Sequence, residues 1–182
     1  TLDLNVKSFI NFYDGYFQKI NLLEENLDFI KEGIEKFLDK DIERIYSKID
    51  GSTALHVRRT DYINMNEELS LNFYRDSIEY CKKNIKNFTY SIFTDDEEFI
   101  KNEIFQDSEN VYIASSKSRN TLDDFLLLSS FKNFIVGNST FSLIAALLGE
   151  VNESLIITAS PWFRNQKSPD LYKSSWITFE NK

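Results

Sequence analysis

Short apolar runs of strand length alternate with longer segments of helical periodicity over most of the chain. The apolar runs fall at residues 53–57, 89–93, 110–114, 133–136 and 154–158. Apolar residues at helical spacing mark the segments 71–85, 122–131 and 139–148 between and after them. This alternation predicts right-handed crossovers and a mainly parallel sheet with helices on both faces. We therefore expect an α/β, Rossmann-like domain over residues 51–182.

The first fifty residues have a different pattern. Apolar residues recur at helical spacing in Leu23, Leu27, Ile30, Ile34 and Phe37, and charged residues occupy the other face. This predicts one amphipathic helix, or two, within residues 22–49. We interpret residues 1–50 as a helical connector that precedes the α/β domain.

Composition narrows the class of protein further. The 182 residues are 42% hydrophobic and 15% aromatic, which is enough to form one substantial core and argues against disorder. No apolar run reaches 18 residues, so no membrane span is predicted. Cys81 is the single cysteine, which excludes an internal disulfide, and its place among apolar residues predicts a buried thiol. The chain begins at Thr1 without a leader, which fits a processed or truncated product.

The formal net charge of −8 bears on the ligand. An anionic ligand must be held by a few local cations or backbone amides, because the overall field opposes it. The same charge disfavours nucleic acid as a partner.

In parallel α/β sheets, ligands bind beyond the carboxyl ends of the strands, so polar residues just after each apolar run are the first candidates. Three runs are followed by distinctive groups. They are Arg58, Arg59, Thr60 and Asp61 after the first run, Thr94, Asp95 and Asp96 after the second, and Gly137, Asn138, Ser139 and Thr140 after the fourth.

Two adjacent arginines at the end of a buried strand are costly unless an anion meets them. Side chains alternate along a strand, so His56 and Arg58 are expected on one side and Arg59 on the other. One arginine can then reach a diphosphate while its neighbour contacts Asp61 or a nearby loop. The alternative is an arginine pair held wholly by carboxylates of the chain itself.

Five segments together resemble the α-1,2-fucosyltransferases. The segment His56-Val57-Arg58-Arg59-Thr60-Asp61-Tyr62 resembles the family's first signature, of which a shorter form occurs in α-1,6- and protein O-fucosyltransferases. Four other segments match family elements and follow the family's order along the chain. They are Gly15-Tyr16-Phe17-Gln18, Phe93-Thr94-Asp95-Asp96, Asn138-Ser139-Thr140-Phe141-Ser142 and Pro161-Trp162-Phe163. These matches extend over nearly the whole chain, and their joint order is far more specific than any one of them.

The resemblance implies one half of a GT-B-like glycosyltransferase that binds GDP-fucose. Such an enzyme transfers fucose with inversion to the 2-hydroxyl of a galactose on an acceptor glycan. It implies catalytic roles for Arg58, Arg59 and Asp61, with arginine in place of a metal ion at the leaving diphosphate, so that no cofactor is expected. A cytoplasmic location, or a peripheral one at the membrane where glycans are assembled, follows from the same resemblance.

Two departures from the family pattern concern the acceptor. The glycine-rich Gly-x-Gly-Asn-Gln motif near the family's N-terminus is absent, as is the domain that carries it. Leu143 and Ile144 stand where the family usually has tryptophans. These differences leave the acceptor glycan open.

Residues 138–142 are expected to open a helix whose exposed amides and positive dipole end form an anion site. Hydroxyls of Ser139, Thr140 and Ser142 add donors there. In the alternative interpretation, Asn138 or Ser139 is only the helix N-cap. Both can hold together, because a capped helix end still presents amides to a phosphate.

Acidic pairs in the chain have ordinary explanations besides metal binding. We interpret Asp95 and Asp96 as partners of a helix N-terminus in preference to metal ligands. Asp39 and Asp41 lie in a helical, solvent-facing pattern and are not expected to bind metal.

Asp124 has two interpretations of equal weight. It can complete a capping box with Thr121 as N-cap. By the resemblance, it can instead pair with the guanine base, because a carboxylate accepts from guanine N1–H and N2–H₂ and offers adenine nothing comparable.

The general base is not evident. His56, the only histidine, lies inside the strand and is expected to position its surroundings in the substrate site more than to catalyse. Glu67 is a weak candidate for the base.

Two rival functions stay open. One is a nucleotide-sugar-binding module without activity, and the other is a related transferase with a different GDP-sugar or an α-1,6 or protein O-linkage.

Overall fold

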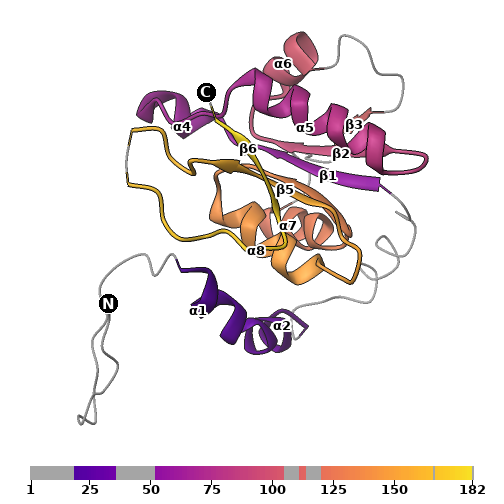
Figure 1. Cartoon of the computed structure of the whole chain (residues 1–182), viewed down its shortest axis with the longest axis vertical. Helices are drawn as coiled ribbons and strands as arrows, with labels where there is room; N and C mark the ends of the chain where they lie inside the picture. Colours follow the sequence, from indigo (N-terminus) through magenta and orange to yellow (C-terminus); the bar gives the residue numbers. More distant parts are fainter. Residues whose placement is uncertain (1–18, 36–51, 105–110, 114–119, 166, 182) are drawn as a thin grey trace.

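A computed structural model describes residues 19–35, 52–104, 111–113, 120–165 and 167–181. Its centre is a six-stranded sheet in which all neighbouring strands are parallel (Figure 1). The strands are β1 (Ser52–Val57), β2 (Thr89–Thr94), β3 (Val111–Ile113), β4 (Asn133–Val136), β5 (Ile156–Ser160) and β6 (Ile177–Glu180). Their order is β3-β2-β1-β4-β5-β6, so the direction of winding reverses between β1 and β4. The Rossmann-like prediction is confirmed.

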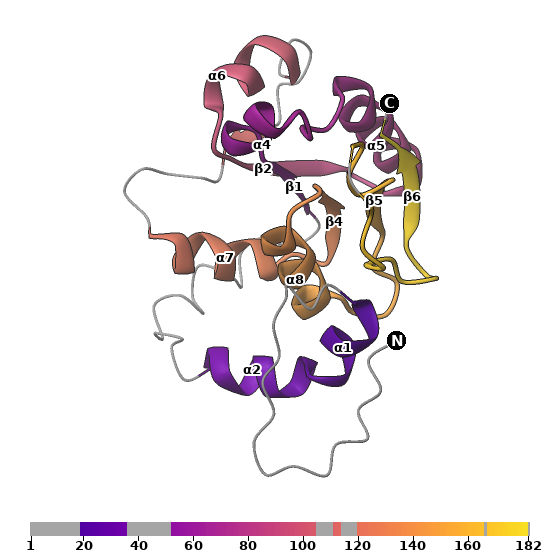
Figure 2. The ribbon, with the colours of Figure 1, turned by 90° about the vertical axis from the view of Figure 1, so that its left-hand side faces the viewer.

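Helices cover both faces of this sheet. They are α1 (Ile20–Glu25), α2 (Leu27–Glu35), α4 (Thr60–Met65), α5 (Leu71–Asn84), α6 (Glu97–Phe99), the π-helical η1 (Ile100–Ile104), α7 (Thr121–Ser129) and α8 (Thr140–Gly149). Helices α5 and α6 lie on one side of the sheet and α7 and α8 on the other, with α1 and α2 outside α8 (Figure 2).

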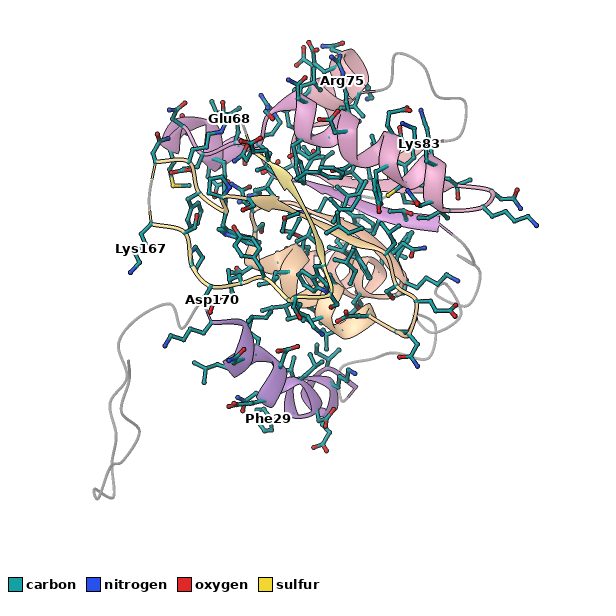
Figure 3. The ribbon with its side chains drawn as sticks, in the orientation of Figure 1. Phe29, Glu68, Arg75, Lys83, Lys167 and Asp170 are labelled. Carbon is teal, nitrogen blue, oxygen red and sulfur yellow. The ribbon has the colours of Figure 1, made fainter. Side chains whose placement is uncertain are left out.

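The strands are buried on both faces because their side chains alternate between two apolar clusters. Ala54 and Val136 pack with the cluster of α7 and α8, whereas Leu55 and Ile135 pack with the cluster of α5. Figure 3 shows side chains filling both layers. The same alternation points His56 toward the α8 side of the sheet. Near-continuous apolar runs are typical of strands covered in this way, which is why the sequence shows them clearly.

The N-terminal pattern forms two short helices separated at Asn26. Ile20 is buried in the cluster of α7 and α8, and Lys173 Nζ lies 3.0 Å from Glu24 and 2.7 Å from Glu150. The rest of the predicted helix, residues 36–49, lies outside the described residues, as do Asp39, Asp41 and the segment Gly15-Tyr16-Phe17-Gln18. The boundary near residue 50 stays a prediction.

Four elements differ from the sequence prediction. Strand β5 begins two residues later than the apolar run 154–158, while α4, η1 and β6 were not predicted. Cys81 is fully buried in α5, as predicted, and burial raises the pKa of its thiol to about 12. Within the described part of the chain, no helix is long and apolar enough to cross a membrane.

Candidate functional site

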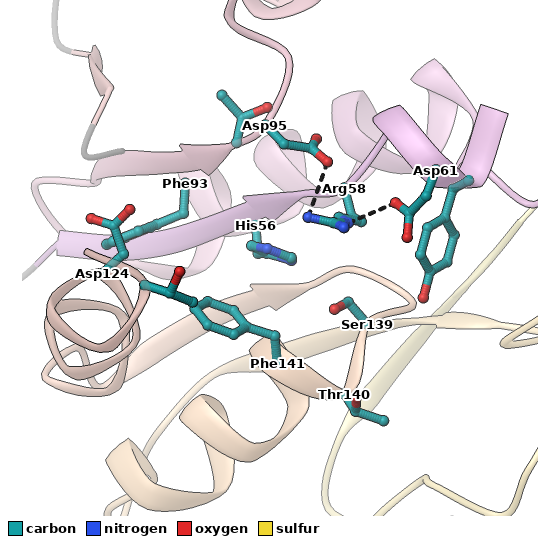
Figure 4. Close-up of a pocket in the computed structure, with 12 residues that line it drawn as sticks. His56, Arg58, Asp61, Phe93, Asp95, Asp124, Ser139, Thr140 and Phe141 are labelled. Carbon is teal, nitrogen blue, oxygen red and sulfur yellow. Dashed lines mark hydrogen bonds and ion pairs between the residues drawn. The ribbon is translucent and has the colours of Figure 1, made fainter. Parts of the chain in front are cut away.

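A polar cavity of about 410 Å³ opens beyond the carboxyl ends of β1, β2 and β4 (Figure 4). This is the topological switch point, where ligands bind in doubly wound sheets. The cavity is lined by His56, Arg58, Asp61, Tyr62, Phe93, Thr94, Asp95, Thr121, Asp124, Ser139, Thr140 and Phe141. Arg58 and Asp61 lie toward one end of the view, Asp124 and Phe93 toward the other, with His56 between them.

Arg58 is held between two carboxylates at the wall of the cavity. Its Nε donates to Asp61 at 2.8 Å, and its Nη1 lies 3.2 Å from Asp95. The hydrogen bond between Arg58 and Asp61 raises the pKa of Arg58 and lowers that of Asp61. The guanidinium keeps its charge and the Arg58 side chain is 40% exposed, so it is oriented yet open to a ligand. Nη2 carries two further N–H donors.

Asp95 fixes the turn that carries this arginine. One carboxylate oxygen accepts from the Arg59 backbone N–H at 2.9 Å, and the other accepts from the Thr60 hydroxyl at 2.6 Å and the Thr60 N–H at 3.3 Å. Asp96 instead caps α6 by accepting from the Phe99 N–H at 3.0 Å. The interpretation of these residues as partners of a helix N-terminus is confirmed for Asp96 at α6, and Asp95 makes its contacts at Arg59 and Thr60, the N-cap and first residue of α4.

Arg59 points away from the cavity. Its Nε donates to Asp96 at 3.2 Å, its Cζ lies 3.7 Å from the centre of the Phe99 ring, and its side chain is 18% exposed. It is not among the residues that line the cavity. The adjacent arginines therefore separate, as strand alternation predicts, and only Arg58 faces the candidate ligand.

The start of α8 forms the opposite wall. Ser139 is the N-cap residue in extended conformation, and its side chain makes no capping hydrogen bond. Ser139, Thr140 and Phe141 line the cavity. The first amides of a helix lack intrahelical acceptors and carry the positive end of its dipole. This ten-residue helix thus directs its first N–H groups and the positive end of its dipole toward the cavity.

Asn138 and Ser142 lie behind that surface. Asn138 is 1% exposed, and its Nδ2 donates to the Glu67 carbonyl at 2.7 Å. The buried Ser142 hydroxyl donates to the Ser139 carbonyl at 3.0 Å. Neither residue lines the cavity, so in this structure their contacts hold the helix start and do not reach a ligand.

The proposed capping box of Thr121 and Asp124 is wrong. Asn120 is the N-cap of α7, with φ −82° and ψ 166°, and its side chain accepts from the Asp123 N–H at 2.9 Å. Thr121 is already helical, so the N-cap lies one residue earlier than proposed. Asp124 lines the cavity in the first turns of α7. Its position is consistent with the other interpretation, contact with a ligand.

His56 forms part of the cavity floor. It is 7% exposed, its ring centre lies 5.6 Å from that of Phe141, and its Nδ1 has no hydrogen-bond partner among the described residues. Burial lowers the pKa of His56 to about 4, so the ring is neutral at pH 7. A base of such low pKa accepts protons poorly, which argues against general-base catalysis and fits a positioning or binding role.

Glu67 is not available as a base in this arrangement. It is 1% exposed, does not line the cavity, and both of its carboxylate oxygens accept backbone N–H groups, from Arg164 at 2.6 Å and Asn165 at 3.1 Å. No group of three or more His, Cys, Asp or Glu side chains within the described ranges is arranged to hold a metal ion.

The sequence did not single out several lining residues. Tyr62, Phe93 and Phe141 lie inside quoted motifs but were not assigned a role, because aromatic residues at strand or helix spacing normally indicate core. Tyr62 Oη donates to the Asn138 carbonyl at 2.9 Å, which joins α4 to the start of α8. An aromatic residue next to a polar motif at the end of a strand was the only available signal.

The fold and site define a doubly wound α/β protein with a polar, arginine-containing cavity at its switch point. The model of the family described as glycosyl transferase family 11 matches residues 4–180, and the chain belongs to this family.

Two Escherichia coli relatives are similar to the chain. An alpha-1,2-colitosyltransferase is 32% identical over 140 residues, which cover 71% of this chain and 48% of that protein. The O-antigen biosynthesis glycosyltransferase WbnK is 27% identical over 180 residues, or 90% of this chain and 59% of that protein. The chain therefore spans about half the length of these relatives.

Proposed function

We propose that this chain is the donor-binding part of an inverting glycosyltransferase that uses GDP-fucose and forms an α-1,2 linkage to galactose on an acceptor glycan. The observation that supports this most is the joint placement of Arg58, the uncapped start of α8 and Asp124 around one cavity. Membership of glycosyl transferase family 11 supports the transfer chemistry.

The cavity has a division of charge that suits a nucleoside diphosphate. Arg58 and the start of α8 supply N–H donors and positive charge at one end, and Asp124 supplies a carboxylate toward the other. A guanine edge presents two donors to a carboxylate, whereas adenine and uracil cannot present the same pair. We assign the diphosphate to the first end and guanine to the second.

In the proposed reaction, the acceptor hydroxyl oxygen bonds to the sugar C1 while the bond from C1 to the β-phosphate oxygen breaks. The electron pair of that bond leaves with GDP, and the hydroxyl proton passes to a base that the described residues do not identify. Arg58 stabilises the growing charge on the leaving diphosphate together with the amides of α8. Asp61 and Asp95 hold Arg58 in place, so little reorganisation accompanies the reaction.

We propose that these positive groups take the role that a divalent cation has in many diphosphate sites, so that donor binding needs no metal. Arg58 is charged throughout the physiological range.

A second donor deserves comparison because one relative is named as an alpha-1,2-colitosyltransferase. The contacts proposed above are to the nucleotide, so the same site can hold another GDP-linked sugar. Competition of GDP-fucose and GDP-colitose for the chain distinguishes the two. The alternative is a binding module, which binds nucleotide and transfers no sugar to any acceptor. This alternative stands because the chain covers only about half of each relative.

The nucleotide class is tested by thermal unfolding with GDP, ADP and UDP at equal concentrations. A ligand that binds only the folded state at 100 times its dissociation constant adds about 2.7 kcal/mol to stability. We expect GDP to raise the melting temperature more than ADP or UDP. Equal shifts for the three nucleotides, or no shift with GDP, contradict the proposed site.

A further inference from the structure

Glu67, between α4 and α5, lies where three segments of the chain meet behind the cavity. We infer that Glu67 is a positioning residue that sets how the start of α8 faces the donor's β-phosphate. This inference rests on the proposed function.

The carboxylate of Glu67 anchors the segment that follows β5. Its two oxygens accept the successive backbone N–H groups of Arg164 and Asn165. Nearby, the exposed Asn165 side chain donates to the Asn66 carbonyl at 2.8 Å, and Trp162 of the same segment is fully buried. An anion that accepts two N–H groups in a buried site is held firmly, because these hydrogen bonds are charge-assisted.

The backbone of Glu67 reaches the start of α8. Its N–H donates to the Tyr62 carbonyl at 3.0 Å, and its carbonyl accepts from Asn138 Nδ2 at 2.7 Å. Asn138 in turn accepts the Tyr62 hydroxyl on its own carbonyl and directly precedes Ser139, the N-cap residue. One residue thus connects the loop of residues 161–165 to the helix end that lines the cavity.

These contacts link Arg164 and Asn165, which directly follow Pro161-Trp162-Phe163, to the start of α8 through Glu67. Glu67 does not line the cavity, so its influence on a ligand passes through Asn138. Oriented donors act on a phosphate only when their geometry is held closely, and shifts of about 1 Å are costly. We therefore expect the loss of one Glu67 acceptor to weaken binding of the β-phosphate specifically.

The test is the substitution Glu67→Gln in the full 182-residue chain. Glutamine presents an amide donor where one of the two N–H groups needs an acceptor. Calorimetry with GDP and with GMP measures the contribution of the β-phosphate. We expect the ratio of GDP to GMP affinity to fall about tenfold, while GMP affinity changes by less than about twofold. Glu79→Gln, the same change at an exposed position of α5, is the matched control and leaves the ratio unchanged.

Other results overturn the inference in distinguishable ways. An unchanged ratio removes the positioning role, and an equal loss of GDP and GMP affinity with a lower melting temperature shows a merely structural one. Normal GDP and GMP binding with lost transfer in the complete enzyme indicates a general base. If the wild-type chain does not bind GDP, the proposed function fails and the inference fails with it.

If Glu67→Gln does not fold, a second variant tests the positioning role of Glu67. Asn165→Ala removes the exposed contact to Asn66 and disturbs the same segment more mildly. We expect the ratio of GDP to GMP affinity to fall by about two- to threefold. An unchanged ratio in this folded variant overturns the inference.

Discussion

At the scale of single residues, the cavity depends on groups that are oriented before any ligand arrives. Arg58 is held by Asp61 and Asp95, and the turn around it is held by Asp95. A guanidinium offers a planar fork of donors that a lysine ammonium cannot reproduce. The three residues act as one unit, so their substitutions are not expected to be additive.

Replacing Arg58 with lysine should be nearly as damaging as replacing it with alanine. Hydrogen bonds to charged groups contribute about 1.5–3 kcal/mol, so GDP affinity should fall by roughly ten- to hundredfold in both variants. Turnover in the complete enzyme should fall by roughly 10²–10³. Calorimetry of each variant measures the affinity, with Arg75→Lys on the exposed side of α5 as the control. If Arg58→Lys binds GDP with wild-type affinity, Arg58 is not part of the proposed diphosphate site.

Arg59 gives a contrasting variant. Its guanidinium lies over Phe99 and pairs with Asp96, so Arg59→Lys should cost about 0.5–1 kcal/mol of folding stability through the lost ring contact. We expect its GDP affinity to fall less than that of Arg58→Lys. Urea unfolding and calorimetry of the same sample compare the two effects, and a larger affinity loss at Arg59 would reverse their assignment.

Asp124→Asn tests recognition of the base. Asparagine puts an amide donor where guanine needs an acceptor, which should cost about 1–3 kcal/mol of GDP affinity. ADP affinity should change little. Asp123→Asn is the matched control, because Asp123 lies beside it in the first turn of α7 and does not line the cavity. An unchanged preference for GDP over ADP would refute base recognition by Asp124.

The single histidine makes a pH dependence easy to assign. Burial lowers the pKa of folded His56 to about 4, below the usual 6.5, so the unfolded chain binds a proton more readily. The folding stability that depends on neutral His56 is complete above about pH 6.5 and is lost as the pH falls toward 4. Between pH 7 and pH 5 the loss should be roughly 2 kcal/mol. Urea midpoints across this range measure it, and His56→Asn should have a flatter profile. Parallel profiles for the two proteins would contradict the burial argument.

At the scale of elements, α8 joins the cavity to the core. Its N-terminus lines the site, and at its other end the Glu150 carboxylate accepts from Lys173 Nζ at 2.7 Å and from Trp176 Nε1 at 3.1 Å. Gly149, the last residue of α8, packs tightly against the corner between α7 and β4. Close approach, and not backbone conformation, requires glycine there.

The pair Gly149→Ala and Gly33→Ala tests this packing. A Cβ on Gly149 would lie 2.5 Å from the Phe131 carbonyl and against the Ser129 carbonyl, so overpacking should cost about 1–3 kcal/mol of stability. A Cβ on Gly33 in α2 meets nothing within 4 Å, so alanine should add about 0.5–1 kcal/mol by favouring the helix. Urea midpoints of both variants give the comparison, and a neutral Gly149→Ala would show that the corner yields.

Elements buried on both faces were predictable from the sequence, and half-exposed ones were not. All four residues of β4 are buried, which produces a clear apolar run. In β6, Ile177 and Phe179 alternate with exposed Thr178 and Glu180 at the edge of the sheet, so a four-residue strand gives little signal. Helix α4 has no apolar stripe and no buried residue, and contacts from Asp95 fix the turn before it.

Site residues were also predictable where the local sequence defines them, and not where a contact distant in the chain decides their orientation. Arg58, Asp61, Ser139 and Thr140 could be found because they follow strands at the switch point. The orientation of Arg59 depends on Asp96, which lies 37 residues away in the chain, and spacing alone does not specify such a contact. The N-cap of α7 was placed one residue late because Asn120 and Thr121 are both acceptable caps.

At the scale of the whole molecule, the strand order brings distant segments of the chain to one cavity. Residues that follow β1, β2 and β4 and those that begin α7 converge there, and the net charge of −8 leaves local groups to hold an anion. The chain spans 48% and 59% of the two relatives. Binding of the donor nucleotide is therefore the property most directly testable on these 182 residues.

Calorimetry of GDP binding in the presence of EDTA tests the central claim most directly. In the proposed site, Arg58 and the amides of α8 supply the positive charge for the diphosphate, so we expect GDP binding in EDTA with an affinity that added magnesium or manganese does not raise. ADP under the same conditions should bind at least about tenfold more weakly. GDP binding that appears only after a divalent metal is added, or equal affinity for ADP, would contradict the account.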